Sequence, residues 1–341
     1  MSRRIGSGEP CYVIAEAGVN HNGRLDVAKH LVDAAVEAEV DAVKFQTFHT
    51  EDLVTQGALL APYQTRTQHT SQYEMLSDLE LSEDALSKLV GYCENKSIEF
   101  LSTPYDRRSV DLLDELGVER FKVASADIVN KPLLQHIAAK KKQVILSSGM
   151  ASMEEIAQAV SWLHESGVRD IVLLHCVSDY PSRLSDQNLR IIETLKSVFQ
   201  LPVGFSDHTV GLTAPITAVS LGAAVVEKHF TLDTESRGPD HKASIEGDEL
   251  IELVTKIREC ERALGQPIKL VSQAEQNNAA KMRTSLHAAT DLEAGDRLTV
   301  DKISIVRPAD GLEPRHFESV VGSQVNREIT AGEPLLWRDF A

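Results

Sequence analysis

Two histidines could hold a metal ion in this 341-residue chain. His208 and His229 each come at the end of an apolar segment, in the sequences Ser-Asp-His and Glu-Lys-His. On neighbouring parallel strands their imidazoles would lie close together and could bind a divalent transition metal, with positions left for water and substrate oxygens. The alternative is a pair of hydrogen-bonded structural histidines. Because no CxxC or HExxH motif supports zinc, we expect a Mn2+-type site that the substrate completes.

Three lysines, Lys44, Lys122 and Lys228, also end apolar segments. A buried lysine is costly unless it is paired or binds an anion. These lysines could form a phosphate or carboxylate site, one could be the Schiff-base lysine of an aldolase, or each could pair with a carboxylate, for example Lys228 with Glu16. Glu16 itself could act as an acid or base, orient a sugar hydroxyl, or balance a lysine. The hydroxyls that could assist anion binding are those of Thr103, Ser125, Ser147 and Ser206.

The four cysteines are widely spaced and form no CxxC motif, so we expect reduced thiols. Cys176 follows His175, which leaves a Cys–His nucleophile as an alternative to a packing role in a strand.

The elements that must position these groups alternate between strand-like and helix-like segments. The expected strands are residues 11–17, 42–48, 99–103, 120–126, 144–148, 170–176, 202–205 and 223–228. The expected helices are residues 27–39, 82–95, 108–116, 131–139, 153–165, 186–199, 213–221 and 248–264. Eight such pairs predict an α/β fold, a (β/α)8 TIM barrel with its active site at the C-terminal ends of the strands. A doubly wound open sheet is the alternative, but no GxGxxG turn follows the first strand.

A second, smaller domain is expected at the C-terminus. The barrel should occupy residues 1–265, a polar linker residues 266–281, and a mostly-β module residues 282–341. Asp291-Leu-Glu-Ala-Gly-Asp-Arg-Leu resembles Glu328-Ile-Thr-Ala-Gly-Glu-Pro-Leu, with the two glycines 37 residues apart, which predicts internal pseudo-symmetry. A module of about 60 residues is marginal alone, so we expect it to dock against a barrel, its own or a partner's.

The composition excludes several classes of partner. With 35 basic and 51 acidic residues the net charge is −16, which argues against nucleic acid and anionic membranes. No apolar run is long enough for a membrane span, and the first residues lack the apolar region of a signal peptide, so we expect a cytoplasmic protein.

An ordered set of motifs covers nearly the whole expected barrel. The set is Ile14-Ala-Glu-Ala-Gly-Val-Asn-His-Asn-Gly, Val43-Lys-Phe-Gln-Thr, Phe100-Leu-Ser-Thr-Pro, Phe121-Lys-Val-Ala-Ser, Ile145-Leu-Ser-Ser-Gly-Met, His175-Cys-Val-Ser-Asp-Tyr-Pro, Gly204-Phe-Ser-Asp-His-Thr, Glu227-Lys-His-Phe-Thr and Gly238-Pro-Asp-His. It resembles the sialic acid synthase family, which condenses phosphoenolpyruvate with N-acylated hexosamines. The C-terminal segment, including Val306-Arg307-Pro308, resembles the antifreeze-like SAF domain of that family.

The resemblance implies a role for each candidate residue. His208 and His229 match metal ligands, with Mn2+ expected and Mg2+ or Co2+ as alternatives, and Glu16 matches a carboxylate near the aldehyde. The positions that match phosphoenolpyruvate contacts are Lys44, Thr103, Lys122, Ser125, Ser147, Ser206 and Arg283. Those that match sugar contacts are Gln46, Tyr180 and Asp240. Arg307 matches an arginine that a partner's SAF domain brings to the N-acyl group, which implies a domain-swapped homodimer.

The activity that the resemblance implies is N-acetylneuraminate synthesis from phosphoenolpyruvate, N-acetylmannosamine and water. Legionaminate or another nonulosonate synthesis is the alternative, because Ser178 stands where some neuraminate-forming members carry Asn. Ala309 stands where Gly often follows Arg-Pro, a change expected to affect only a loop. Two rival hypotheses are a Schiff-base sugar aldolase, and a non-enzymatic scaffold whose C-terminal module binds ice or carbohydrate.

Overall fold

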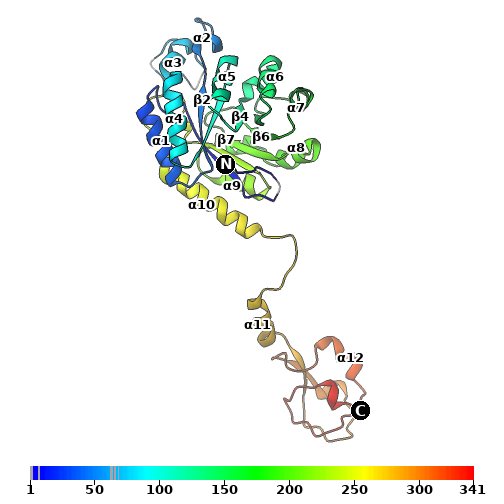
Figure 1. Cartoon of the computed structure of the whole chain (residues 1–341). Coiled ribbons are helices and arrows are strands. Elements are labelled where there is room, and N and C mark those ends of the chain that lie inside the picture. The colour runs from blue at the N-terminus through cyan, green and yellow to red at the C-terminus, as the bar shows by residue number, and fades with distance from the viewer. Residues whose placement is uncertain (1–2, 7, 62–63, 65–66, 68) are drawn as a thin grey trace. The chain divides into compact units, whose positions relative to one another are not determined.

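The computed structural model describes residues 3–6, 8–61, 64, 67 and 69–341. The chain divides into two compact units, Met1–Gly265 and Gln266–Ala341, coloured blue to yellow and yellow to red in Figure 1.

The described part of the first unit contains eight parallel strands in the order β3-β2-β1-β8-β7-β6-β5-β4. They are β1 (Tyr12–Gly18), β2 (Ala42–Thr47), β3 (Glu99–Pro104), β4 (Arg120–Val123), β5 (Gln143–Ser147), β6 (Ile171–Cys176), β7 (Val203–Asp207) and β8 (Val225–His229). The two end strands, β3 and β4, also lie beside each other, so the sheet forms a nearly closed barrel. The predicted TIM barrel is therefore confirmed.

Helices follow the strands and surround the sheet (Figure 1). They are α1 (Leu25–Glu37), α2 (Thr50–Leu53), α3 (Gln72–Leu79), α4 (Glu83–Asn95), α5 (Arg107–Glu115), α6 (Lys131–Ala139), α7 (Met153–Glu165), α8 (Ile191–Phe199), α9 (Thr213–Ser220) and α10 (Gly247–Leu264). Polar caps fix several helix starts: Ser82 accepts a hydrogen bond from the Ala85 amide, and Ser152 forms a capping box with Glu155. None of the described helices is long and apolar enough to span a bilayer.

Most barrel elements lie within two residues of the predicted bounds, and three features of the barrel unit differ by more. The expected helix over 186–199 begins at Ile191, after a short 3-10 turn at Leu184–Asp186. The fourth strand ends at Val123, and a 3-10 turn takes up Ser125–Asp127. The polar insertion between β2 and α4 contains α2 and α3, whose few apolar positions give only a weak periodic signal.

Side chains alternate between the barrel interior and the helix layer, as the period of a strand requires. Ile14, Leu101 and Val225 belong to a small apolar cluster made almost entirely of strand residues, which fills the barrel. The residues between them on each strand belong to the large cluster that packs under the helices. Two positions beyond the interior layer, the inward side chains become polar, and these residues form the site described below.

The second unit has its own small core. It contains α11 (Gln273–Met282), within the stretch expected to be a linker, the antiparallel pair β9 (Ser285–Ala288) and β10 (Ile303–Val306), and the short helix α12 (Phe317–Val320). The two similar segments pair with each other, since the amides of Leu292 and Ile329 each donate to the other's carbonyl. The hydrogen bonds Gly295 N–Val325 O and Gly332 N–Ala288 O are equivalent after a shift of 37 residues. The predicted pseudo-symmetry is confirmed.

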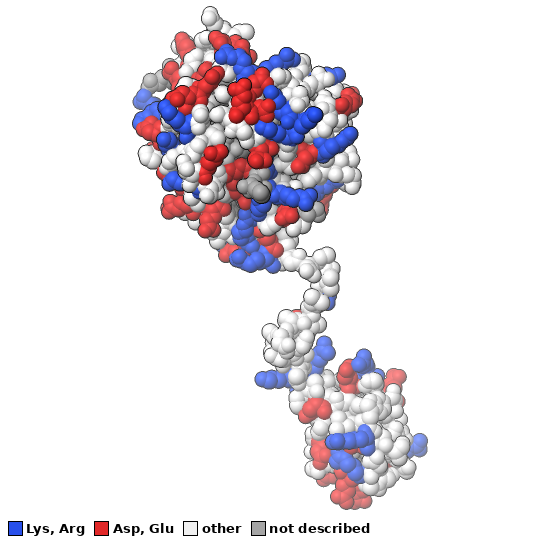
Figure 2. Space-filling model, viewed as in Figure 1, with Lys and Arg blue, Asp and Glu red and all other residues white. Residues whose placement is uncertain are grey.

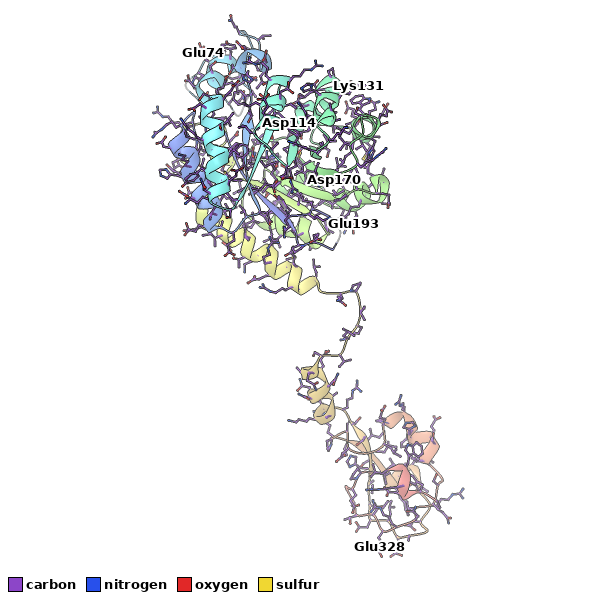
Figure 3. The ribbon with its side chains drawn as sticks, in the orientation of Figure 1. Glu74, Asp114, Lys131, Asp170, Glu193 and Glu328 are labelled. Atoms are coloured by element: carbon purple, nitrogen blue, oxygen red, sulfur yellow. The ribbon has the colours of Figure 1, made fainter. Side chains whose placement is uncertain are left out.

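Charged residues of both signs are interspersed over the face of the first unit that Figure 2 shows. Many acidic and basic side chains project away from the ribbon, among them Glu74, Lys131, Asp170 and Glu193 in Figure 3. These four side chains are exposed to solvent.

Candidate active site

A pocket of about 390 Å³ lies at the C-terminal ends of the barrel strands. Its lining includes each barrel residue to which the family resemblance gives a role. These are Glu16, Lys44, Gln46, Thr103, Lys122, Ser125, Ser147, Tyr180, Ser206, His208, His229 and Asp240. The structure therefore brings together residues from all eight strands and their following loops, as a TIM-barrel active site requires.

Two lysines meet two carboxylates at the bottom of the pocket. Lys44 Nζ lies 2.8 Å from Glu16 Oε2 and 3.5 Å from Glu227 Oε2. Lys122 Nζ lies 3.7 Å from the other oxygen of Glu227. All four side chains are at most 4% exposed, so these charges interact with little solvent screening.

Glu227 was not among the residues singled out by sequence, although it lies between both lysines. A usable signal was present: if His229 faces the pocket, Glu227, two positions earlier on the same strand, must face it too. Burial raises the pKa of the Glu227 carboxyl, but Lys122 and Lys44 outweigh that effect and lower it to about 2. Glu227 is therefore ionised at neutral pH.

Glu16 behaves differently from Glu227. Burial raises the pKa of Glu16 to about 7, against the opposing attraction of Lys44. The pair thus combines one permanently ionised carboxylate with one carboxyl that can hold or release a proton near neutral pH. When Glu16 is protonated, the two lysines and Glu227 leave one net positive charge for an anion.

Hydroxyl groups surround the lysines. Lys44 donates to Thr103 Oγ1 at 3.2 Å, and Lys122 donates to Ser147 Oγ at 2.6 Å. Ser206 donates to Glu227 Oε1 at 2.8 Å, and Ser125 accepts from the Gly149 amide at 3.0 Å. These contacts orient the ammonium groups and place hydroxyls that a phosphate or carboxylate could use.

Close packing beside the Ser125 hydroxyl requires a glycine at position 149. A Cβ atom at Gly149 would lie 2.3 Å from Ser178 Oγ, 2.8 Å from Ser125 Oγ and 2.9 Å from Cys176 Sγ. The loop after β5 can therefore approach Ser125 only because residue 149 has no side chain.

The two histidines lie side by side, with ring centroids 5.4 Å apart. His208 Nδ1 lies 2.8 Å from the Val177 carbonyl oxygen, so this nitrogen carries the proton and Nε2 keeps its lone pair. His229 Nδ1 is buried and has no hydrogen-bond partner. Burial lowers the pKa of both imidazoles, and the neighbouring ring lowers that of His229 further, so both are neutral.

This pair fits a divalent metal on its own chemistry. Two neutral imidazoles with available lone pairs are good ligands. The Val177 carbonyl orients the His208 ring through Nδ1, as a hydrogen-bond acceptor typically does for a metal-binding histidine. An unpartnered buried nitrogen such as His229 Nδ1 is costly in a purely structural role. The residues present therefore suit the metal that the sequence predicted there.

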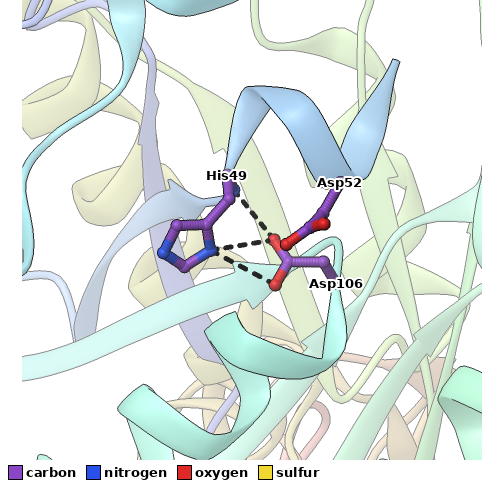
Figure 4. Close-up of side chains that lie close together, drawn as sticks. All are labelled: His49, Asp52 and Asp106. Carbon is purple, nitrogen blue, oxygen red and sulfur yellow. Dashed lines mark hydrogen bonds and ion pairs between the residues drawn. The ribbon is translucent and has the colours of Figure 1, made fainter. Parts of the chain in front are cut away.

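A different group of metal-type ligands is formed by His49, Asp52 and Asp106 (Figure 4). Asp106 caps α5, where its carboxylate accepts the Ser109 amide at 2.7 Å and the Ser109 hydroxyl at 2.6 Å. It also accepts the His49 amide at 2.8 Å. Since these hydrogen bonds account for the Asp106 carboxylate and Asp52 is exposed, the cluster has a structural explanation in joining β2 to α5.

Lys228 does not join the other two lysines, so the expectation of three converging lysines is wrong. It is fully buried on the opposite face of β8, and its Nζ lies 2.7 Å from Asp207 Oδ2. The reason is the alternation of the strand, which turns Lys228 outward when Glu227 and His229 point inward. The partner of Lys228 is therefore Asp207 and not Glu16. Glu16 pairs with Lys44 instead.

The Cys–His nucleophile finds no support. His175 Nε2 lies 2.6 Å from the Gln187 carbonyl and its ring stacks on Phe205, whereas Cys176 faces the pocket. Burial raises the pKa of the Cys176 thiol, so the nucleophilic thiolate is disfavoured.

Two of the three candidate sugar contacts, Gln46 and Asp240, lie near the end of β1. Gly18 has a φ of +53°, and a Cβ atom there would lie 3.2 Å from Glu16 Oε1, 3.3 Å from Gln46 Nε2 and 3.5 Å from Asp240 Oδ2. Three polar groups thus surround one backbone position. The third candidate, Tyr180, lies beside His208, with the centroids of the two rings 4.2 Å apart.

The remaining two candidates, Arg283 and Arg307, belong to the second unit. Both are exposed and line a hollow of about 670 Å³ within that unit, together with Glu313. Their expected roles toward phosphate and the N-acyl group stay predictions.

One wall of the barrel pocket is apolar, which the sequence analysis did not foresee. Leu53, Val54 and Ala61 come from the insertion after β2, and Met75 and Leu79 lie on α3. Met75 and Leu79 are buried in a small apolar cluster with Phe48. The pocket therefore has a charged bottom and an apolar side.

Comparison with known proteins gives consistent matches over both units. The family model described as the NeuB family matches residues 31–269, and the SAF domain model matches residues 283–341. The N,N'-diacetyllegionaminic acid synthase of Legionella pneumophila is 44% identical, over 97% of this chain and 95% of its own length. The human N-acetylneuraminate-9-phosphate synthase is 37% identical, over 95% of this chain and 90% of its own length. The crystal structure of the N-acetylneuraminic acid synthetase of Leptospira borgpetersenii with citrate superposes with a TM-score of 0.73 and 36% identity, covering 80% of this chain and 92% of that one.

Proposed function

Because this chain belongs to the NeuB family and ends in a SAF domain, we propose that it condenses phosphoenolpyruvate with an N-acylated hexosamine to form a nonulosonate and phosphate. The observation that carries the proposal is the position of Lys44 and Lys122, 3.5 and 3.7 Å from Glu227, in the same pocket as the His208–His229 pair. It is an enzyme that forms a carbon–carbon bond, as its family implies.

Anion binding is the first task of the pocket. Phosphoenolpyruvate carries a carboxylate and a phosphate, and Lys44 and Lys122 with their hydroxyl partners can hold the two groups. Protonation of Glu16 as the anion enters would free Lys44 from the nearer of its two counter-ions. Glu227 would keep the two ammonium groups apart and oriented.

The bond-forming step joins C3 of phosphoenolpyruvate to the aldehyde carbon of the open-chain sugar. Glu16, with its pKa near 7, donates a proton to the aldehyde oxygen as it becomes a hydroxyl. This leaves a cation at C2, to which water adds while Glu16 takes back one of the water protons. The C2–O bond to phosphate then breaks, and the departing phosphate takes the remaining hydroxyl proton, which leaves the 2-keto acid. His208 and His229 would hold a divalent metal, with Mn2+ expected, which supplies Lewis-acid polarisation of a carbonyl oxygen when bound. Lys44 and Lys122 position the anion and stabilise the charge on the leaving phosphate.

Two acceptors fit this scheme. N-acetylmannosamine would make the enzyme an N-acetylneuraminate synthase. The apolar wall of Leu53, Met75 and Leu79 favours a second candidate, a 6-deoxy diacetamido hexose, because its methyl and acetyl groups could pack there without burying unpaired hydroxyls. The 44% identity to an N,N'-diacetyllegionaminic acid synthase supports the same choice.

The test is release of inorganic phosphate from phosphoenolpyruvate and Mn2+ with each acceptor in turn. We expect phosphate release only when an N-acylated hexosamine is present, and an advantage of about 10-fold or more in kcat/KM for the 6-deoxy sugar, since one well-matched methyl group is worth about 10- to 200-fold. No release with either sugar would refute the proposed function. Equal activity with both would refute the second candidate alone.

A second copy of the chain is the proposed partner. Exposed apolar side chains occur on the loops that follow β4 to β8, at the pocket end of the barrel: Val129, Met150, Leu184, Val210 and Leu232. Met150 and Val210 are each 73% exposed, and apolar groups around a pocket are typical of a covered surface. The resemblance to the sialic acid synthase family suggests the SAF domain of a second copy as the cover, in a cytoplasmic homodimer. Light scattering should give the mass of a dimer for the intact chain and of a monomer after Met150→Glu and Val210→Glu, whereas an intact chain that is monomeric would exclude this partner.

A further inference from the structure

The turn after β1 is joined to the loop after β8 by a buried polar side chain. Asn20 is only 2% exposed, and its Nδ2 donates to the Phe230 carbonyl at 2.9 Å and to Ser244 Oγ at 3.0 Å. Asn20 has no role in the proposed catalytic steps. A buried amide with these two partners connects segments more than 200 residues apart in the sequence.

The connection continues to the main chain of Asp240. Ser244 Oγ, having accepted from Asn20, donates its own proton to the Asp240 carbonyl oxygen at 2.8 Å. The Ala243 amide donates to the same oxygen at 3.1 Å. The backbone of Asp240 is thus fixed to the β1 turn through one serine hydroxyl.

His241, the next residue, is fixed from the other side. Its Nε2 lies 3.4 Å from Asn22 Nδ2, which is a donor, so Nδ1 carries the proton and donates to Thr231 Oγ1 at 2.7 Å. A Cβ atom at Gly238 would lie 2.6 Å from His241 Cδ2, so the loop packs directly on the ring. The imidazole therefore holds the 231–246 loop against the β1 turn.

None of these contacts involves the Asp240 carboxylate itself. That group is 7% exposed and lines the pocket, close to Gly18 and to Gln46. All the hydrogen bonds described above act on its main chain or on its neighbours. The arrangement fixes where the carboxylate stands and leaves its oxygens for a ligand.

We propose that Asn20 and His241 are positioning residues that fix the Asp240 carboxylate at the acceptor end of the pocket, so that the β1 turn controls affinity for the sugar. The inference rests on the proposed function, in which Asp240 contacts the acceptor. Since the lysines would hold phosphoenolpyruvate, the affinity for phosphoenolpyruvate would not depend on this contact. The chemistry at issue is recognition of a sugar hydroxyl or amide group by a carboxylate.

The experiment measures KM for each substrate by phosphate release in Asn20→Ala, Ser244→Ala and His241→Asn variants. Loss of positioning should raise the acceptor KM about 10- to 100-fold, with the phosphoenolpyruvate KM changed by less than about 2-fold. Ser244→Ala removes only one hydroxyl group, and it tests the same connection if Asn20→Ala folds poorly. The matched control is Ser109→Ala, which removes a buried hydroxyl from the Asp106 cap on α5 and should leave both KM values unchanged.

Combination with Asp240→Ala distinguishes positioning from a general structural role. If Asn20 acts through Asp240, then Asn20→Ala should raise the acceptor KM no further in the Asp240→Ala background. An equal additional rise there, or an unchanged acceptor KM in Asn20→Ala alone, would overturn the inference while the proposed function stands. A wild-type enzyme that releases no phosphate with either acceptor would instead overturn the proposed function, and this inference with it.

Discussion

Replacing Glu227 by Gln should destabilise the empty barrel and make its stability depend on anions. The substitution preserves shape and can keep the Ser206 hydrogen bond, but it removes the charge that faces Lys44 at 3.5 Å and Lys122 at 3.7 Å. At an effective dielectric constant near 20, each attraction is worth about 4–5 kcal/mol before desolvation. Lys44 keeps Glu16 as a partner, whereas Glu227 is the carboxylate that lies within ion-pair distance of Lys122 in the described part of the chain.

The net effect is smaller than the sum of the two attractions, since the ionised carboxylate of Glu227 also lost its hydration on burial. Removing one partner of a buried ion pair typically costs about 3–5 kcal/mol. For a barrel of this size we expect a fall in Tm of about 6–15 °C in anion-free buffer, measured by calorimetry. Adding inorganic phosphate should then raise the Tm of Glu227→Gln more than that of the wild type, because the anion replaces the missing charge.

A matched control lies at the opposite end of the barrel. Glu99 begins β3 and its Oε1 lies 2.7 Å from Nε of the buried Arg120, the first residue of β4. Glu99→Gln should lower the Tm comparably but gain nothing from phosphate beyond the wild-type response. If phosphate stabilises both variants equally, or if Glu227→Gln melts with the wild type, the reasoning about the two lysines is refuted.

Three further predictions concern the same pocket. Burial raises the pKa of Asp240 to about 6, whereas the unfolded chain loses this proton near pH 3.8. Wild-type stability relative to Asp240→Asn should therefore fall by about 2 kcal/mol between pH 4 and 6, and urea unfolding that shows a constant difference would contradict this. His229→Ala should abolish both phosphate release and the Mn2+ response, and substantial metal-dependent turnover in that variant would exclude the assignment. Borohydride added during turnover should leave Lys44 and Lys122 unmodified by mass spectrometry, and a trapped adduct would instead support the Schiff-base aldolase.

Much of the barrel could be predicted because its strands are buried on both faces and end in polar residues. The same pattern located Glu16, Lys44 and His229, each an inward position at or near the C-terminal end of its strand. The pairing of Lys44 with Glu16 could not be derived, because it depends on the register between β1 and β2. The prediction for Lys228 was wrong for a related reason. A lysine at a strand end can face either the barrel interior or the helix layer, and Lys228 must face away from the pocket because it directly precedes the inward His229.

The parts that sequence reasoning missed have weak local signals. The apolar wall comes from α2 and α3, short segments in a polar insertion, whose burial is decided by contact with Phe48 and the pocket. The linker contains the exposed helix α11, which is set by the Ser272 capping box with Glu275 and buries no apolar side chain of its own. The link from Asn20 to Asp240 joins two turns that periodicity alone cannot pair.

A crystal structure of the enzyme with Mn2+ and phosphoenolpyruvate tests the central claim most directly. We expect one Mn2+ bonded to ring nitrogens of both His208 and His229, with the phosphate and carboxylate of phosphoenolpyruvate against Lys44 and Lys122. Metal bound at His49, Asp52 and Asp106 while the histidine pair stays empty, or phosphoenolpyruvate bound outside the barrel pocket, would contradict it.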